Sequence, residues 1–573
     1  MTVLSNTTPS VVANAVDNGR VAPNTPVSHL FLVLKSSDEQ ETALRGLLDD
    51  QQDKSSPNYH QWMTPDAFGA TFGVASGDVA KVAAWLQDSG FAVQPVARGG
   101  RILQFSGTTG QVETAFQTEL HHITVNGEAH ISNTKDISVP SALTPVIAGI
   151  SALNDFYPKS RAVNPHKLVM GADGQLYPVI PGTDAPDYTS LSSGSHYVGP
   201  ADLATIYNGK TLLASGIDGT GVTIGIIGQT SVNLSDVQTY RQLFNLPDND
   251  PLIVNVGPPP AIIGDDIESD LDLELAGALA VRAQIKFFTA GGSLLDGGVS
   301  TSALTAVDTN GADIISLSYG GCELSNGSSG TAYWNTLWQQ AAAQGQTVFV
   351  STGDSSATGC ASSSAALANT ATSGTYGVNA LGSSAYNVAV GGSEFNEGTT
   401  TGLTSYWGPG GFSPYGTALS YIPETVWSEG SFDIVQTESG VAGSGGGVSM
   451  FTGRPPWQTG TGISSTADPA GPTFTASGAI PASQLHRLVP DVALIAASGH
   501  DGTIFCSEGS CKINSDGTVG SLGIVGGTSV ATPTMAPSWR STAPKLAVAG
   551  SSSPSQATAS RPWCGLSTRC RSG

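Results

Sequence analysis

The segment VTIGIIG at residues 222–228 is a near-continuous apolar run of the length of one strand. A strand that is apolar on both faces is typical of a parallel sheet covered by helices on its two sides. Further strands are predicted at residues 284–288, 314–317 and 347–350, and helical stretches at residues 235–244, 266–283, 304–309 and 333–344. This alternation predicts an α/β unit, a parallel sheet with helices on both faces.

A smaller unit is expected N-terminal to this sheet, over residues 24–156, after an N-terminal segment of residues 1–23. Strands are predicted at residues 27–34, 91–96, 101–105 and 120–125, and helices at residues 39–52, 77–89 and 111–116. Strands and helices that interleave in this way predict an α+β unit.

Residues 157–196 separate the two units. Their central part, residues 160–194, is rich in Pro, Gly, Ser and Asp and has no hydrophobic period. This texture predicts an exposed linker that is open to maturation cleavage. The larger unit then covers residues 197–536, and no elements are predicted for its Gly/Ser/Thr-rich residues 359–478.

Composition excludes several functions. The chain has 573 residues, which suggests two or more domains. Charged residues are only 12% and the formal net charge is −22, so we expect no affinity for nucleic acid or for an anionic membrane. No apolar run approaches the ~20 residues that span a bilayer.

Residues 1–18 lack the basic and apolar regions of a signal peptide, so either export uses another route or the true start lies upstream.

Cysteines are even in number, which permits disulfides in an oxidising compartment. Cys506 and Cys511 flank a short Ser-Glu-Gly-Ser turn and could close a small loop, with free thiols as the alternative. No Cys-x-x-Cys pair or Cys/His cluster indicates zinc. The six are Cys322, Cys360, Cys506, Cys511, Cys564 and Cys570.

The octet GGTSVATP at residues 526–533 contains the candidate nucleophile, Ser529. Glycine permits close backbone approach, and a helix that begins here would offer free N–H groups and a positive dipole end to a developing oxyanion. Gly-Thr-Ser alone is equally typical of a serine that caps a helix. The whole octet is more specific and favours a catalytic serine.

The usual base for such a serine is a histidine, but no histidine of the larger unit lies in a suitable motif. Only His486 and His500 lie inside the larger unit, with His196 at its edge, and none is followed by Gly-Thr as in a subtilisin-type site. An aspartic peptidase would need two Asp-Thr/Ser-Gly motifs, and the nearest stretch is Asp308-Thr309-Asn310. Both classes are therefore discarded.

Two carboxylates offer another base. The segment GDDIESDLDLELAGALA at residues 264–280 places Glu268 and Asp272 four residues apart, on one face of the predicted helix. Neighbouring carboxylates repel, so one holds its proton more tightly. Such a pair can relay a proton from Ser529 at an acidic pH, where imidazole is already protonated. The alternative is a solvated helix start, where the dipole favours acids.

A third candidate, Asp354, lies in the segment STGDS directly after the strand predicted at residues 347–350. The carboxyl ends of parallel strands are where such folds place their active sites. A protonated Asp354 in an apolar site could donate to an oxyanion. An ordinary turn aspartate is the alternative.

These segments together resemble the sedolisin (serine-carboxyl peptidase) family, in particular its kumamolisin branch, over most of the chain. Tyr319 stands where many members have Trp. Further matching stretches are SSPNYHQW at 55–62, QFSG at 104–107, SLSYG at 316–320, AVGG at 389–392, SGGGVS at 444–449 and VPDV at 489–492.

The resemblance implies a subtilisin-like parallel sheet preceded by a ferredoxin-like pro-kumamolisin activation domain, which inhibits the peptidase and aids its folding. It implies Ser529 as nucleophile, Glu268 and Asp272 as the carboxylates of a triad and Asp354 as the oxyanion residue. We therefore expect the precursor (zymogen) of an acid-acting serine-type endopeptidase that forms an acyl-enzyme and removes its own prodomain. Its partners would be protein or peptide substrates and that prodomain, and it would be a secreted monomer that binds neither membrane nor nucleic acid.

One departure concerns residues 537–573, where the resemblance stops. The family continues with a helix and a calcium loop built on Asp side chains, whereas these residues contain no Asp or Glu. Calcium is thus implied by the resemblance, but its ligand motif is not found and the metal ligands stay unknown. We expect a frameshift or truncation near Ala536, with a naturally divergent tail as the alternative. A catalytically impaired pseudopeptidase is the alternative function.

Overall fold

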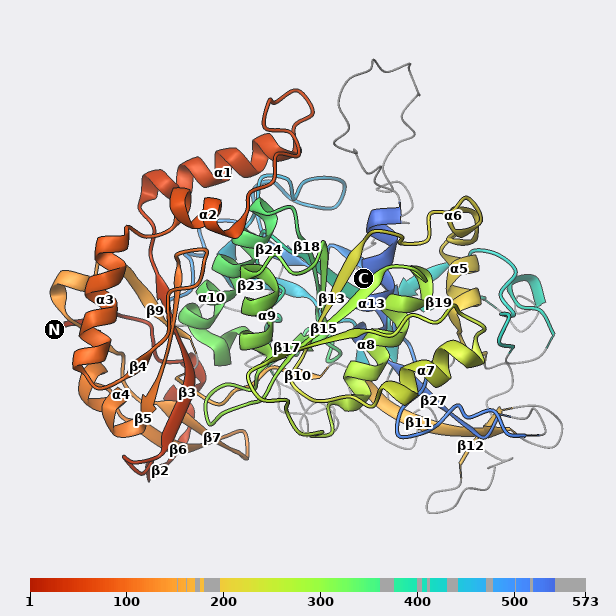
Figure 1. Cartoon of the computed structure of the whole chain (residues 1–573), viewed down its shortest axis with the longest axis horizontal. Coiled ribbons are helices and arrows are strands. Elements are labelled where there is room, and N and C mark those ends of the chain that lie inside the picture. Colours follow the sequence, from red (N-terminus) through yellow and green to blue (C-terminus); the bar gives the residue numbers. More distant parts are fainter. Residues whose placement is uncertain are drawn as a thin grey trace.

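The computed structural model describes residues 1–541 except 152, 161, 171–175, 180–195, 361–375, 399–403, 410–412, 430–441, 470–477, 500 and 516–518. The expected tail at residues 537–573 therefore lies almost entirely outside the described residues. The rest of the chain forms a smaller N-terminal unit and a larger unit that lie side by side (Figure 1).

The N-terminal unit is built on a four-stranded antiparallel sheet with the order β4-β5-β3-β9. Three helices follow β3 and one follows β5, which is the βαββαβ succession of a ferredoxin-like fold, as expected. The strands are β3 (Pro26–Leu34), β4 (Ala92–Val93), β5 (Ile102–Thr108) and β9 (Ile147–Ser151), and the helices are α1 (Asp38–Gln52), α2 (Pro65–Phe72), α3 (Ser76–Asp88) and α4 (Thr109–Phe116).

Local sequence explains where these helices begin. Ser37 accepts a hydrogen bond from the backbone of Gln40 while the Gln40 side chain accepts one from the backbone of Ser37, a capping box that starts α1. The N-terminal segment belongs to this unit as well, because β1 (Thr2–Val3) pairs with β8 (Ser138–Val139). A second sheet is formed by β2 (Val16–Arg20), β6 (Leu120–Val125) and β7 (Glu128–Asn133).

The larger unit contains the predicted parallel sheet, with the order β14-β15-β13-β16-β18-β19-β20 and with β25 also pairing with β19. Only β20 runs antiparallel to its neighbour. The predicted run at 222–228 forms the central strand β13. The strands are β13 (Thr223–Gly228), β14 (Leu252–Val256), β15 (Gln284–Ala290), β16 (Ile314–Leu317), β18 (Thr347–Ser351), β19 (Val388–Phe395), β20 (Glu424–Val426) and β25 (Val492–Ile495).

Helices cover both faces of this sheet, as alternating side chains on each strand require. On one face, Ile227, Leu317 and Val350 pack against α9 and α10. On the other, Ile226 and Phe349 pack against α7, α8 and α13. The helices of this unit include α5 (Pro200–Ile206), α6 (Lys210–Ala214), α7 (Leu234–Leu243), α8 (Asp266–Leu279), α9 (Val299–Asp308), α10 (Glu323–Ala343) and α13 (Thr528–Ser541).

The two units share an apolar interface. Phe31 of β3 packs against Tyr333 of α10 in a tilted arrangement, with ring centroids 5.1 Å apart. In the other direction, Leu295 of the larger unit is 1% exposed and belongs to the core of the N-terminal unit. Asp308, at the end of α9, accepts hydrogen bonds from the backbone N–H groups of Arg98 and Gly99 at 2.8 and 3.0 Å.

The segment between the units differs from the exposed, featureless linker predicted for it. Its described residues include the strands β10 (Lys159–Ser160), β11 (Val163–Met170) and β12 (Leu176–Pro178). β10 pairs with β17 (Tyr319–Gly320), while β11 joins a sheet of order β12-β11-β27-β26 with β26 (Thr503–Phe505) and β27 (Ser521–Gly526). Leu168 is completely buried. Strand addition is made by backbone hydrogen bonds, so it needs no hydrophobic period.

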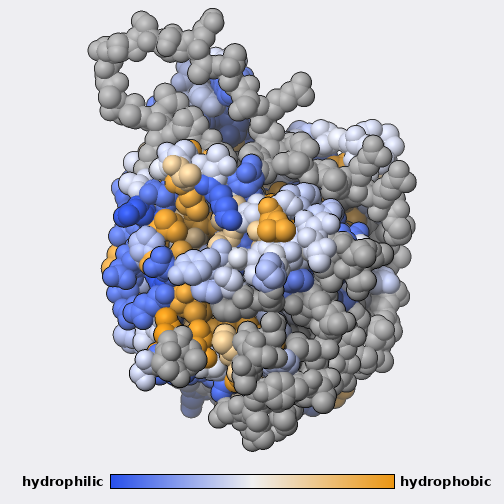
Figure 2. All heavy atoms as spheres, turned by 90° about the vertical axis from the view of Figure 1, so that its right-hand side faces the viewer, coloured by the Kyte–Doolittle hydropathy of each residue, from blue (hydrophilic) through white to orange (hydrophobic). Residues whose placement is uncertain are grey.

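Two disulfides close loops of the larger unit, Cys322–Cys360 and Cys506–Cys511. The second is the small loop considered from the sequence, while Cys564 and Cys570 lie outside the described residues. Among the described residues, no helix has the length and apolar character needed to cross a membrane. The face turned to the viewer in Figure 2 carries an uneven band of apolar atoms between hydrophilic ones.

Candidate active site

Ser529 is the second residue of α13, and it is completely buried. The turn before it needs glycine: Gly527 has φ 105°, and a Cβ on Gly526 would lie 2.5 Å from the carbonyl oxygen of Ala496. The Ser529 hydroxyl donates to Oε2 of Glu268 at 3.0 Å. The predicted nucleophile and the first predicted carboxylate are thus in direct contact, although 261 residues separate them in the chain.

Glu268 and Asp272 lie on one face of α8, as predicted from their spacing, but the helix start is not solvated. Glu268 is 1% exposed and Asp272 is completely buried. Burial, with the charge of neighbouring Glu268, raises the pKa of Asp272 well above its usual range. Oδ1 of Asp272 accepts a hydrogen bond from the hydroxyl of Ser318 at 2.6 Å. This environment favours the protonated form of Asp272, while Oε2 of Glu268 faces Ser529.

Ser318 and Tyr319 also lie beside these carboxylates. Sequence reasoning gave Ser318 no role, and it noted Tyr319 only as the residue that replaces a common family Trp near the carboxylates. Ser318 bonds Asp272 through its hydroxyl, and its carbonyl oxygen lies 3.4 Å from the Ser529 hydroxyl. Tyr319 is completely buried, and burial together with nearby carboxyls raises the pKa of its phenol well above 10.0. The signal in the sequence was the matching stretch SLSYG at residues 316–320, which overlaps the end of the strand predicted at residues 314–317.

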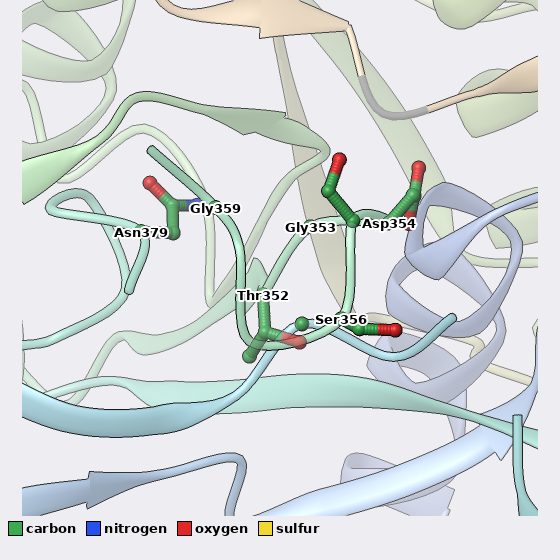
Figure 3. A pocket seen from close by; sticks show the side chains of 8 residues that line it. Thr352, Gly353, Asp354, Ser356, Gly359 and Asn379 are labelled. Atoms are coloured by element: carbon green, nitrogen blue, oxygen red, sulfur yellow. The ribbon is translucent and has the colours of Figure 1, made fainter. Parts of the chain in front are cut away.

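Asp354 follows β18, as predicted, and lies beside the start of α13. Its Oδ1 accepts hydrogen bonds from the backbone N–H and the hydroxyl of Thr528, at 2.7 and 2.8 Å. The carboxyl group therefore contacts the residue before Ser529. Thr352, Gly353 and Asp354 line a small pocket together with Gly359 and Asn379 (Figure 3).

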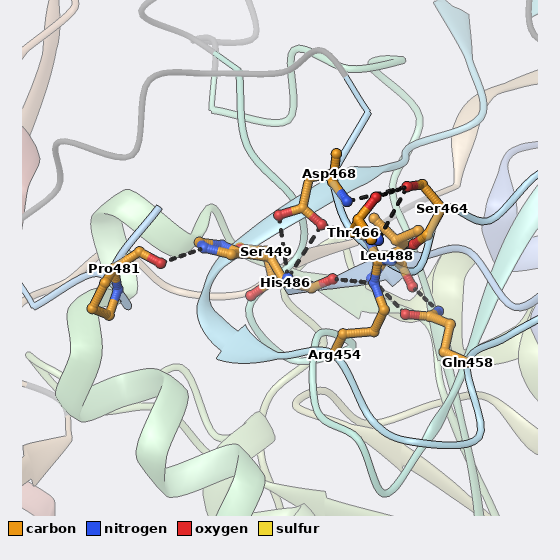
Figure 4. Close-up of polar contacts among 10 residues, drawn as sticks. Ser449, Arg454, Gln458, Ser464, Thr466, Asp468, Pro481, His486 and Leu488 are labelled. Carbon is orange, nitrogen blue, oxygen red and sulfur yellow. Dashed lines mark hydrogen bonds and ion pairs between the residues drawn. The ribbon is translucent and has the colours of Figure 1, made fainter. Parts of the chain in front are cut away.

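The histidines of the larger unit that the structure describes are engaged elsewhere. His486 is completely buried, with Nδ1 2.7 Å from the carbonyl oxygen of Ser449 and Nε2 3.3 Å from that of Pro481 (Figure 4). The ring of His196 stacks on Trp407 at 4.5 Å. His500 lies outside the described residues. The side chain that accepts the Ser529 hydroxyl is the carboxylate of Glu268, and neither of these two rings.

The segment between the units enters this site. The hydroxyl of Ser160 and the backbone N–H of Ala162, the latter at 2.8 Å, both donate to Oε2 of Glu268. β10 lies antiparallel to β17, so that Ser160 faces Tyr319 in the strand register. This segment was expected to be cleavable, and the structure brings it to the candidate carboxylate.

Calcium does not fit the donors that the structure describes. Within these residues, no group of three or more His, Cys, Asp or Glu side chains is arranged to hold a metal ion. Residues 537–573, where the resemblance would put a calcium loop, supply no carboxylate at all. Calcium normally takes about 6–8 oxygen ligands, carboxylates among them.

A second pair of acids on α8, Asp270 and Glu274, was not singled out from the sequence. Both are 1% exposed, and both bond the disulfide loop: the Ser507 hydroxyl donates to Asp270 at 2.7 Å, and the Cys506 N–H donates to Glu274 at 2.9 Å. Burial raises the pKa of Asp270 to about 8 and that of Glu274 well above its usual range. α8 thus carries buried acids toward Ser529 and toward this loop.

Comparison with known proteins bears on both units. A family model described as pro-kumamolisin, activation domain, matches residues 13–156. Kumamolisin of Bacillus sp. (strain MN-32) is 27% identical over 537 residues, which cover 91% of this chain and 81% of kumamolisin. Sedolisin of Pseudomonas sp. (strain 101) is 26% identical over 522 residues, covering 89% of this chain and 75% of that protein.

Xanthomonalisin of Xanthomonas sp. (strain T-22) is 26% identical over 530 residues, 88% of this chain. The chain spans only 56% of the length of xanthomonalisin. Among solved structures, Pseudomonas sedolisin, described as a serine-carboxyl proteinase complexed with two molecules of pseudo-iodotyrostatin, has a TM-score of 0.42 at 24% identity. The matched region covers 61% of this chain and 80% of the Pseudomonas sedolisin chain.

These relatives agree with the family suggested by the sequence motifs. Residues 13–156 match the pro-kumamolisin activation domain, and over most of its length the chain is similar to serine-carboxyl peptidases of the sedolisin–kumamolisin type.

The second acid pair generates a prediction about pH. In the folded chain Asp270 keeps its proton up to pH about 8, whereas the unfolded chain releases it near the ordinary value of 3.8. Its contribution to stability is therefore present below pH ~4 and is lost as pH rises toward 8. Asp270→Asn, which cannot ionise, should raise the free energy of unfolding at pH 7–8 by a few kcal/mol and change it little at pH 4.

Thermal melts of the precursor at pH 4, 6 and 8 measure this effect. Asp49→Asn, at an exposed position of α1, serves as the control and should give no pH-dependent gain. An Asp270→Asn variant that melts earlier than the natural chain at every pH would show that the ionisation of Asp270 is not limiting.

Proposed function

We propose that this chain is the precursor of an acid-acting serine-type endopeptidase in which Ser529 is the nucleophile and Glu268 its base. The observation that carries the proposal is the 3.0 Å hydrogen bond from the Ser529 hydroxyl to a buried carboxylate oxygen of Glu268. A nucleophile within hydrogen-bond reach of its base, and a base oriented by a third group, is the arrangement that activates a serine.

In the proposed mechanism the Ser529 oxygen attacks the carbonyl carbon of the scissile peptide bond while Glu268 takes the hydroxyl proton. Asp272, whose pKa is raised by its burial and by the charge of Glu268, would support Glu268 during the proton transfer. Asp354 stabilises the oxyanion beside the start of α13, where the helix dipole also favours negative charge. The tetrahedral intermediate expels the amine, which receives the proton from Glu268, and water then releases the acyl group from Ser529.

The N-terminal unit would act as inhibitor and would be removed by cleavage within residues 157–196. The pairing of β10 with β17 and the contacts of Ser160 and Ala162 with Glu268 support this, because they bring the segment to the candidate nucleophile. Protein or peptide substrates would then occupy the vacated strand position. We infer a secreted protein, in keeping with its two disulfides, that acts as a monomer.

The first prediction concerns maturation. Purified precursor, moved to acidic pH, should lose its N-terminal unit through a cut between about Ser160 and His196, and mass spectrometry of the products should place that cut. Ser529→Ala should stay at full length under the same conditions. Equal processing of the variant, with no other protease present, would exclude Ser529 as the nucleophile.

The second prediction concerns pH and the carboxylates. Activity should peak in the acidic range and fall before neutrality, since a carboxylate base with a reference pKa of ~4 works where imidazole, at ~6.5, is protonated. Glu268→Gln and Asp272→Asn should each lower kcat by orders of magnitude, measured with a quenched fluorescent peptide. An alkaline optimum would rule out the carboxylate mechanism.

The third prediction concerns calcium. Residues 537–573 carry five Lys or Arg and no carboxylate, so this chain should bind calcium poorly, and melting curves recorded with calcium and with chelator should coincide. A large calcium-dependent rise in melting temperature would reveal an ion site elsewhere. The same lack of acids favours the second candidate function, an impaired pseudopeptidase, which would be indicated by a precursor that is folded but inert at acidic pH.

A further inference from the structure

Ser160 lies where it competes with the nucleophile for its base. Three donors converge on Oε2 of Glu268: the Ser529 hydroxyl at 3.0 Å, the Ala162 N–H at 2.8 Å and the Ser160 hydroxyl in a shorter contact. A carboxylate oxygen offers about two lone-pair directions. The two donors from the segment between the units therefore compete with Ser529 for the oxygen that would take its proton.

The position of Ser160 is fixed on both sides. Before it, Asp155 lies 3.0 Å from Nδ1 of His130 on β7, and the Tyr157 hydroxyl donates to the carbonyl oxygen of Ser293 at 2.9 Å. After it, β11 pairs with β27 from Val163 to Val169, next to the helix that carries Ser529. The N-terminal unit and the larger unit thus hold the segment at both ends, and the backbone of Ser160 cannot move away from Glu268 without a shift of the paired strands.

From this geometry we propose that Ser160 is an autoinhibitory latch, a residue of the chain itself that occupies the catalytic base of the precursor and slows its first cleavage. The inference rests on the proposed function, because it takes Glu268 to be the base of Ser529. The latch opens when the segment is cut or when β10 leaves β17. The backbone N–H of Ala162, without the Ser160 hydroxyl, is not enough to keep it closed. Ser160 is a positioning residue with no role in the chemistry of mature turnover.

The test compares the full-length precursor with Ser160→Ala and Ser160→Thr. The first removes the hydroxyl and the second keeps it, and Ser141→Ala makes the same chemical change at an exposed position of the N-terminal unit. The first-order rate of size loss at acidic pH is followed by gel and intact mass, at several protein concentrations to isolate the intramolecular step. A parallel reading is the rate at which a small peptide aldehyde, which forms a hemiacetal with an activated serine, is captured by Ser529 in uncut precursor.

Ser160→Ala should process and capture aldehyde on the order of tenfold faster than the natural chain, the factor expected from one hydrogen bond to a charged group. Ser160→Thr and Ser141→Ala should match the natural chain, and all mature products should have the same kcat. Equal or slower rates for Ser160→Ala, in a chain that does process, overturn the latch alone. If neither the natural chain nor Ser160→Ala processes or captures aldehyde, the proposed function fails and the latch with it.

Discussion

The hydrogen bond between Ser529 and Glu268 joins two buried side chains, and the elements of the larger unit around it exclude solvent from it. An ionised carboxylate in such a place is costly unless donors face it. The donors come from separate parts of the chain: α13 supplies the Ser529 hydroxyl, and the residues after β16 supply Ser318 to Asp272. The site therefore exists only when the central sheet, α8 and α13 are all in place.

Helix α8 carries most of the buried acids for which partners must be found. Every residue from Glu268 to Gly277 is buried, so its acids can face only the protein interior. Glu268 and Asp272 face Ser529, whereas Asp270 and Glu274 bond the loop closed by Cys506 and Cys511. Burial favours the protonated form of a carboxyl group. The pKa values of Asp270, Asp272 and Glu274 are raised for this reason, so the interior face of α8 is least costly when these acids keep their protons.

Periodicity and local motifs were enough to predict much of this arrangement. The apolar run at residues 222–228 and the strands around it formed the central sheet, and the spacing of Glu268 and Asp272 correctly placed both on one helix face. Ser318 could not be assigned a partner, because its bond to Asp272 spans 46 residues and depends on how β16 meets α8. The second acid pair was hidden for another reason: alternate acids at a helix start are ordinarily solvated, and only tertiary packing buries them.

The strands β10 and β11, in the described part of the segment between the units, were not predicted from the sequence, and the reason is physical. β10 and β11 are held by backbone pairing to β17 and β27, an interaction that any extended peptide can make and that leaves no trace in residue type. Backbone pairing alone therefore places Ser160 opposite Tyr319, and from there the Ser160 hydroxyl and the Ala162 N–H reach Oε2 of Glu268.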